Sequence, residues 1–213
     1  VDISGNAAPQ QTGNIDIILG IEPVTLALVT SSDSGVKGDD ITSDTTPSFV
    51  ATAGEGDVLQ FIITNSSGDV QNHTQEVSST NVGVVTYAIN VVALPPGEYT
   101  YSATSTDAIG NVSTTDAAIT IDTQGPGPTG ALTSLDSGHL TNDGVTNTQP
   151  TFGGSSEAGA EVTLTINAIS YTVIVPQGGV WSIPVANALA DGNYAYTMFA
   201  TDVAGNQGTD TAG

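Results

Sequence analysis

The stretch that decides the fold is GEYTYSATSTDAIGN, residues 97–111, which returns as GNYAYTMFATDVAGN at residues 192–206. In the first copy, Tyr99, Tyr101 and Ala103 alternate with polar residues, which is the two-residue period of a half-buried β-strand. A turn signal rich in Asp, Gly and Asn follows in both copies. The pattern therefore predicts one strand and one turn that the chain uses twice.

A second pair of segments shows that the duplication is long. DSGVKGDDITSDTTPSF, residues 33–49, returns as DSGHLTNDGVTNTQPTF at residues 136–152, and the two copies meet at a joint, IDTQGPGP, residues 121–128. We expect residues 1–22 to be the last strand and linker of a preceding repeat. Residues 23–124 are then the first repeat, and residues 125–213 are a second repeat without its last strand. Each repeat has the usual size of one domain.

The remaining apolar runs are spaced as in a β-sandwich. Short runs rich in β-branched residues are separated by Gly-, Pro- and Asn-rich turns every 8 to 12 residues or so. No stretch carries the sustained apolar period of a helix. The sequence predicts an all-β chain of tandem immunoglobulin-like sandwiches arranged end to end. Trp181 falls on a strand, where a core aromatic is the first interpretation and an exposed side chain that stacks on sugars is the second.

The charge balance of the chain is one-sided. Its 213 residues hold 22 acids and one base, Lys37, for a formal net charge of −21. Sixteen of the acids are aspartates, and most lie in turns. Aspartate is common in turns because its side chain accepts hydrogen bonds from the nearby backbone. This preference does not explain why Lys and Arg are almost absent. The balance argues against nucleic acid and anionic lipid as partners, and no apolar run is long enough to cross a membrane.

Few side chains remain for catalysis. The chain has no cysteine, which removes thiol catalysis and thiolate metal sites. His73 and His139 lie in different repeats, and neither belongs to a recognisable catalytic or metal-binding motif. Two carboxylates would suffice for a glycosidase, but no pattern marks a cleft. We therefore expect that this chain is not an enzyme.

Aspartates in turns favour a hard cation such as Ca²⁺, which takes about six to eight oxygen ligands. In a seven-stranded sandwich, the first loop lies at the outgoing end and the turn before the last strand lies at the incoming end. The first loop of one repeat, the joint, and that turn of the next repeat should therefore meet. The acids that this arrangement gathers are Asp33, Asp39, Asp40, Asp44, Asp122 and Asp202, with Glu157 and Glu161 from a neighbouring turn.

Equivalent positions elsewhere supply further candidate ligands. They are Asp107, Glu55 and Asp57 at the incoming end of the first repeat, and Asp136 and Asp143 in the first loop of the second repeat. That second loop is poorer in acids, because Asn142 and Asn147 replace two aspartates of the first copy. Three interpretations stay open: a Ca²⁺ ion at the joint, a cation inside a first loop only, or no specific metal.

Three motifs carry a resemblance to a known family. TDxxGN at residues 106–111 and 201–206, DxTPxF at residues 44–49, and IDT…GP at residues 121–126 resemble the bacterial immunoglobulin-like repeats of giant type I-secreted adhesins, including RTX-type and biofilm-associated adhesins. The resemblance covers nearly the whole chain. It implies an extracellular stalk of β-sandwiches on a bacterial surface, used in cell adhesion and biofilm formation. It also implies calcium at or near the joints and neighbouring repeats as partners.

Two other interpretations stay open. A carbohydrate- or receptor-binding module of the adhesin would cluster exposed aromatic side chains on one surface, whereas the Tyr and Phe residues here fall on inward-facing positions. The spare strand at residues 15–21 would also fit the incomplete second repeat of a neighbouring molecule, which would give head-to-tail chains by strand exchange. The boundaries of the chain are the simpler explanation of the spare strand.

Overall fold

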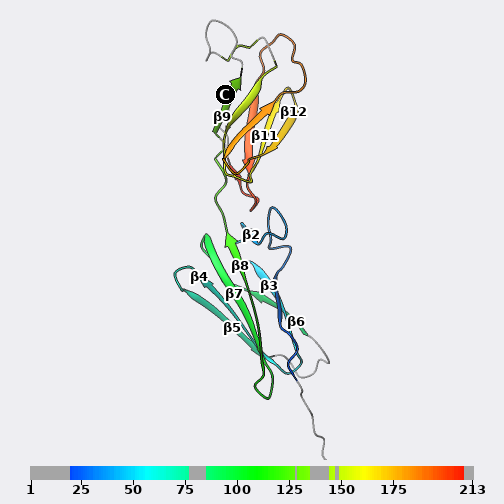
Figure 1. Ribbon diagram of the computed structural model, residues 1–213, viewed down its shortest axis with the longest axis vertical. Helices are drawn as coiled ribbons and strands as arrows, with labels where there is room; N and C mark the ends of the chain where they lie inside the picture. The colour runs from blue at the N-terminus through cyan, green and yellow to red at the C-terminus, as the bar shows by residue number, and fades with distance from the viewer. Residues whose placement is uncertain (1–19, 77–84, 128, 135–143, 147–148, 209–213) are drawn as a thin grey trace, which may run out of the picture.

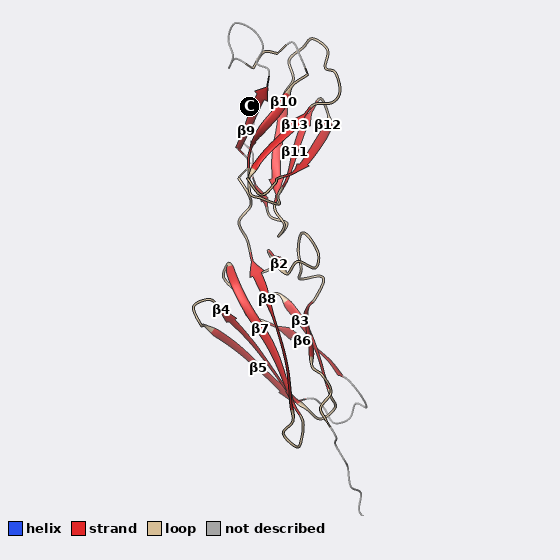
Figure 2. Ribbon diagram, in the orientation of Figure 1, coloured by secondary structure: helices blue, strands red, loops and turns tan. Residues whose placement is uncertain are grey.

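The computed structural model describes residues 20–76, 85–127, 129–134, 144–146 and 149–208. Every regular element among them is a strand, which confirms the all-β prediction (Figure 2). Within this part of the chain, no helix is long and apolar enough to span a membrane. The strands form two groups stacked along the long axis of the molecule and connected by the segment around residues 122–127 (Figure 1).

The first group is a sandwich of two sheets. One sheet has the order β1 (Thr25–Leu28), β3 (Ser48–Ala53), β6 (Val85–Asn90). The other has the order β2 (Ile41–Thr42), β8 (Val112–Ile121), β7 (Gly97–Thr106), β4 (Val58–Asn65), β5 (Val70–Glu76). Most neighbours are antiparallel, but β2 runs parallel to the end of β8, with Thr42 opposite Ile121. This parallel pair lies at the end of the sandwich that faces the joint (Figure 1).

The second group repeats the plan. One sheet has the order β13 (Val180–Pro184), β10 (Thr151–Ser155), β9 (Thr129–Ser134). The other has the order β12 (Ile169–Ile174), β11 (Glu161–Ile166), β14 (Tyr196–Thr201), β15 (Gln207–Gly208). All of these strand pairs are antiparallel.

Each sandwich buries its own apolar core between its sheets. In the first core, the ring of Phe49 lies 5.1 Å from Phe61 and 4.7 Å from Tyr101, measured between centroids. In the second core, Trp181 is only 2 % exposed and packs in the same cluster as Leu164 and Met198. The burial of Trp181 confirms its interpretation as a core aromatic and excludes a sugar-stacking role in this structure.

One tyrosine fixes the same corner in both sandwiches. The Tyr99 hydroxyl donates a hydrogen bond of 2.8 Å to the carbonyl of Pro95, and the Tyr194 hydroxyl donates one of 3.0 Å to the carbonyl of Ala190. A tyrosine bonded to the backbone a few residues upstream is a recurrent feature of immunoglobulin-like sandwiches. The repeat in the sequence is therefore also a repeat in the structure.

Two of the observed strands have no apolar alternation of their own. β2 lies inside the acidic first loop and spans two residues, whereas β5 has the polar sequence VQNHTQE. Both strands depend on hydrogen bonds to a neighbouring strand more than on an apolar pattern of their own. Residues 15–19 of the strand expected over residues 15–21 lie outside the described residues.

Candidate metal centre

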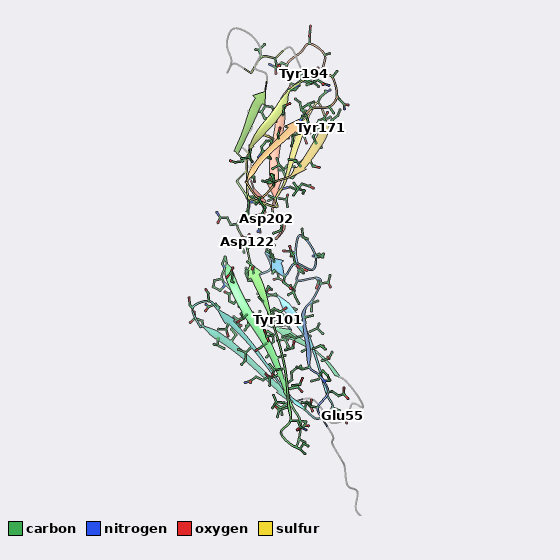
Figure 3. The ribbon with its side chains drawn as sticks, in the orientation of Figure 1. Glu55, Tyr101, Asp122, Tyr171, Tyr194 and Asp202 are labelled. Carbon is green, nitrogen blue, oxygen red and sulfur yellow. The ribbon has the colours of Figure 1, made fainter. Side chains whose placement is uncertain are left out.

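The acids at the joint come from three segments that are far apart in the sequence. Asp122 follows β8, Glu157 lies in the turn between β10 and β11, and Asp202 follows β14. Their carboxylate groups each offer an oxygen within 4.8 Å of the others. Figure 3 shows Asp122 and Asp202 close together between the sandwiches. The two domains thus supply one acidic cluster, which we name the joint triad.

The buried member of the joint triad is held by an asparagine of its own turn. Asp202 is 5 % exposed, and its Oδ1 accepts a hydrogen bond of 2.8 Å from the backbone N–H of Asn206. The side-chain amide of Asn206 donates to Asp202 Oδ2 at 3.0 Å and to the carbonyl oxygen of Asp122 at 2.8 Å. Asn206 therefore orients the Asp202 carboxylate and ties it to the backbone of the joint.

The electrostatics of the joint triad favour a cation. Burial, and then the charges of Asp122 and Asp202, raise the pKa of Glu157 above its ordinary value. The only base in the sequence, Lys37, donates from Nζ to the carbonyl of Asp33 in the first loop. Because the three carboxylates repel one another, a positive ion among them would lower the energy of the docked joint.

The space beside the joint triad suits an ion with water ligands. An open cavity of about 300 Å³ adjoins Glu157 and is lined by Asp122, Gln124, Gly125, Pro126, Gly127 and Glu157. Carboxylate and carbonyl oxygens, together with water, form the donor set that Ca²⁺ prefers. The residues at the joint therefore fit Ca²⁺: Asp122, Glu157 and Asp202 would hold it, and Asn206 would orient Asp202.

The first loop holds a second group of acids close to the joint. Asp33 is 5 % exposed, and its Oδ2 accepts a hydrogen bond of 2.5 Å from the N–H of Gly38. Its Oδ1 is buried and has no hydrogen-bond partner among the described residues. Burial, and then the charges of Asp33 and Asp39, raise the pKa of Asp40 above its ordinary value. These three acids lie at the expected end of the domain, but they are not members of the joint triad.

Two further predicted ligands of this end serve local structure or lie open to solvent. Asp44 Oδ1 accepts hydrogen bonds from the N–H and the hydroxyl of Thr46, at 2.9 and 3.2 Å, and so caps its own turn. Glu161 begins β11 with an exposed side chain. The structure brings neither of them into the joint triad.

The acids at the incoming end of the first domain lie far from the joint. Asp57 is buried, and its Oδ2 accepts hydrogen bonds from the Ser105 hydroxyl at 2.6 Å and the Gly54 N–H at 3.2 Å. Glu55 is exposed at that end (Figure 3). Asp107 caps its turn, because Asn111 donates to it from the backbone at 2.8 Å and from the side chain at 2.7 Å. Asp136 and Asp143 lie outside the described residues.

The close packing of the joint backbone has no signal in the sequence. A Cβ on Gly125 would lie 2.5 Å from the carbonyl oxygen of Gln207, so only glycine lets the joint pass β15 at this distance. The run of glycines and prolines predicts a joint, but it does not say which glycine touches the next domain. The contact depends on the angle between the domains, which no local pattern records.

Comparison with known proteins follows the same division of the chain. The sequence profile described as bacterial Ig-like domain matches residues 20–123 and 128–213. Among curated protein sequences, none matches this chain.

Several solved structures are similar to it. They include a tetra-tandem repeat from the extending region of a large adhesion protein (22% identity, TM-score 0.39, covering 90% of this chain and 48% of that one). A second is a Ca²⁺-stabilised adhesin that helps an Antarctic bacterium bind ice (24% identity, TM-score 0.40, covering 100% of this chain and 53% of that one). A third is a 1.5-MDa bacterial ice-binding adhesin (20% identity, TM-score 0.37, covering 87% of this chain and 62% of that one). The chain thus spans less than two thirds of each of these structures. With two matches that together cover most of its length, the chain belongs to the bacterial Ig-like domain family.

Proposed function

We propose that this chain is a stalk segment of a large bacterial surface adhesin, in which Ca²⁺ at the joint stiffens consecutive Ig-like domains. The observation that carries the proposal is the joint triad, whose three carboxylates come from both domains and offer oxygens within 4.8 Å of one another. In this proposal, residues 23–124 and 125–213 are two repeats, and residues 1–22 end a preceding one. The partners are neighbouring repeats of the same chain, and the segment works outside the cell in adhesion and biofilm formation.

The position of each ligand explains how one ion would stiffen the chain. Asp122 belongs to the end of the first domain, whereas Glu157 and Asp202 belong to the second. A bound Ca²⁺ ion would supply attraction to all three carboxylates and so link the two domains. The glycines and prolines between them would then no longer act as a flexible linker. Because free calcium is scarce inside cells and abundant outside, the joint would tighten after export.

The structure offers less support for a ligand-binding module. Every described Phe, Tyr and Trp side chain whose burial is resolved is buried or partly buried. Tyr171, Tyr194 and Tyr196, which are partly exposed, pack against the second core. Sugar-binding surfaces of the stacking kind use exposed aromatic faces. A stalk accounts for these positions better than a binding module does.

Calorimetric titration of calcium into the chelator-treated full chain tests the proposal. We expect saturable binding, with affinity reduced about tenfold or more in Asp122→Asn, because the site loses a charged ligand; tenfold corresponds to about 1.4 kcal/mol. Asp116→Asn is the matched control, since Asp116 is exposed on β8, the strand that leads to Asp122. Equal binding by the two variants, or no binding by the unmodified chain, would contradict the proposal.

A further inference from the structure

The two domains touch at a second place that uses no carboxylate. The N–H of Val36, in the first loop, donates a hydrogen bond of 2.9 Å to the carbonyl of Val203. The hydroxyl of Ser34 donates one of 2.5 Å to the carbonyl of Ala204. Val203 and Ala204 belong to the turn that follows β14. We name this contact, between residues 34–36 and residues 203–205, the backbone latch.

We propose that the backbone latch is a metal-independent recognition surface, by which the turn after β14 binds the Ser-Gly loop of the repeat that precedes it. Its partner is therefore a second Ig-like domain with a Ser-Gly sequence in its first loop. The latch goes beyond the proposed function, because it holds the two domains docked against each other before any ion binds. In the absence of an ion, the latch favours docking while the repulsion of the joint triad opposes it.

Two glycines make the close approach of the latch possible. Gly35 has φ of 59°, and a Cβ added to it would overlap the carbonyl oxygen of Val203. Gly205 has φ of 84°, and a Cβ there would lie 3.0 Å from the backbone nitrogen of Gly35. The two backbones thus meet where neither residue has a side chain. Larger residues at either position would hold the domains apart.

The first domain contains the same turn without a partner domain among the described residues. In both turns the aspartate accepts a hydrogen bond of 2.8 Å from the backbone N–H of its asparagine, Asn111 or Asn206. Ile109 is nevertheless 63 % exposed, whereas Ala204 at the matching position is 0 % exposed. A Cβ on Gly110 would meet no atom within 4 Å. The burial at Ala204 is therefore due to the contact between domains and not to the turn itself.

The loop that enters the latch is held in place by β2. The N–H of Ser43 donates a hydrogen bond of 2.7 Å to the Ser34 hydroxyl, and the Ser34 N–H donates one of 3.2 Å to the Thr42 hydroxyl. The N–H of Asp122 donates to the carbonyl of Thr42 at 2.8 Å. One rigid unit therefore positions both Ser34 and Asp122. Closure of the latch would place Asp122 opposite Glu157 and Asp202 in advance of an ion.

Amide hydrogen exchange of the full chain in chelator tests the latch directly, because the Val36 N–H is one of its bonds. We expect this amide to exchange at least about tenfold more slowly than an open loop amide, and Gly35→Ala to remove that protection. Gly38→Ala is the matched control, since Gly38 lies in the same loop with φ of 86° and an added Cβ would meet nothing within 4 Å. Gly38→Ala should keep the protection.

A second pair of variants covers the case in which Gly35→Ala fails to fold. Gly205→Ala should weaken the protection of Val36, whereas Gly110→Ala, with a comparable φ of 91° and open surroundings, should not. An unprotected Val36 amide in the unmodified chain, or equal effects of Gly205→Ala and Gly110→Ala, would overturn the proposal. The result would differ if only the calcium proposal failed. The Val36 amide would then be protected in chelator, and adding calcium would not change its exchange rate.

Discussion

Asn206 and Asn111 occupy the same position in two copies of one turn, yet they have different partners. The side-chain amide of Asn111 donates to Asp107, whereas that of Asn206 donates both to Asp202 and to the carbonyl of Asp122 in the other domain. A residue that caps a turn in one copy therefore also connects two domains in the other. The difference comes from what lies next to the turn and not from the turn sequence.

Glu157 gives the joint triad a pH dependence that can be measured. Burial and the charges of Asp122 and Asp202 raise its pKa in the folded chain above the ordinary value of 4.5. Between the ordinary pKa and the raised one, the folded state binds more protons than the unfolded state. The metal-free chain should therefore gain stability as the pH falls through this window and lose it as the pH rises.

Chemical denaturation in chelator across this pH range would check the dependence on Glu157. At neutral pH, Glu157→Gln should be more stable than the unmodified chain, and the difference should vanish as the pH falls below the ordinary pKa of a glutamate. Glu55→Gln, at the exposed incoming end of the first domain, serves as the control. A constant difference between Glu157→Gln and the unmodified chain at all pH values would show that its charge does not matter to folding.

The sequence indicates the end of the domain where acids gather better than it indicates which acids meet. Asp122, Glu157 and Asp202 are all in the predicted set, and so are Asp44 and Glu161, which the structure leaves out of the joint triad. Asp44 instead accepts hydrogen bonds from Thr46, two residues away. An aspartate that caps its own turn and an aspartate that faces another domain look the same in the sequence. Only the docking of the two domains distinguishes them.

At the scale of single strands, β2 has an influence out of proportion to its two residues. The Thr42 side chain is fully buried, and its hydroxyl donates to the Ser32 carbonyl at 2.6 Å while it accepts from the N–H of Ser34 and of Asp44. These bonds fold the first loop back onto β8. The loop that forms the backbone latch therefore depends on one buried hydroxyl group.

Thr42→Val should remove this support while it keeps the shape of the side chain. The variant leaves buried polar groups unpaired, so we expect the free energy of unfolding of the first domain to fall by about 1–3 kcal/mol. Urea denaturation measures the change. In β7, Thr104 shares an exposed hydrogen bond with Thr114, and Thr104→Val should cost less than about 0.5 kcal/mol. Similar losses in the two variants would mean that Thr42 is an ordinary strand residue.

Strands with a clear alternation could be predicted from sequence, and strands without one could not. The sequence predicts the alternation of Tyr99, Tyr101 and Ala103, and all three side chains are buried in β7. β2 spans only two residues and β5 is mostly polar, so neither has an apolar alternation of its own before it pairs with β8 or β4. Such strands follow from the sheet they join, which is a property of the whole domain.

At the scale of the whole molecule, two separate cores are joined through a narrow contact. The formal net charge of −21 acts against close docking of the domains, while the backbone latch acts in favour of it. In the proposed function, these two effects oppose one another, and an ion that binds only the docked joint would shift the balance further toward docking. The stiffness of the stalk would then follow the calcium concentration around it.

Small-angle X-ray scattering of the full chain, first in chelator and then in excess calcium, measures whether calcium stiffens the joint between the two domains. We expect calcium to narrow the range of interdomain distances to the single extended arrangement of Figure 1. Asp116→Asn should respond as the unmodified chain does, whereas Asp122→Asn should respond much less. Scattering curves of the unmodified chain that coincide with and without calcium would contradict the claim.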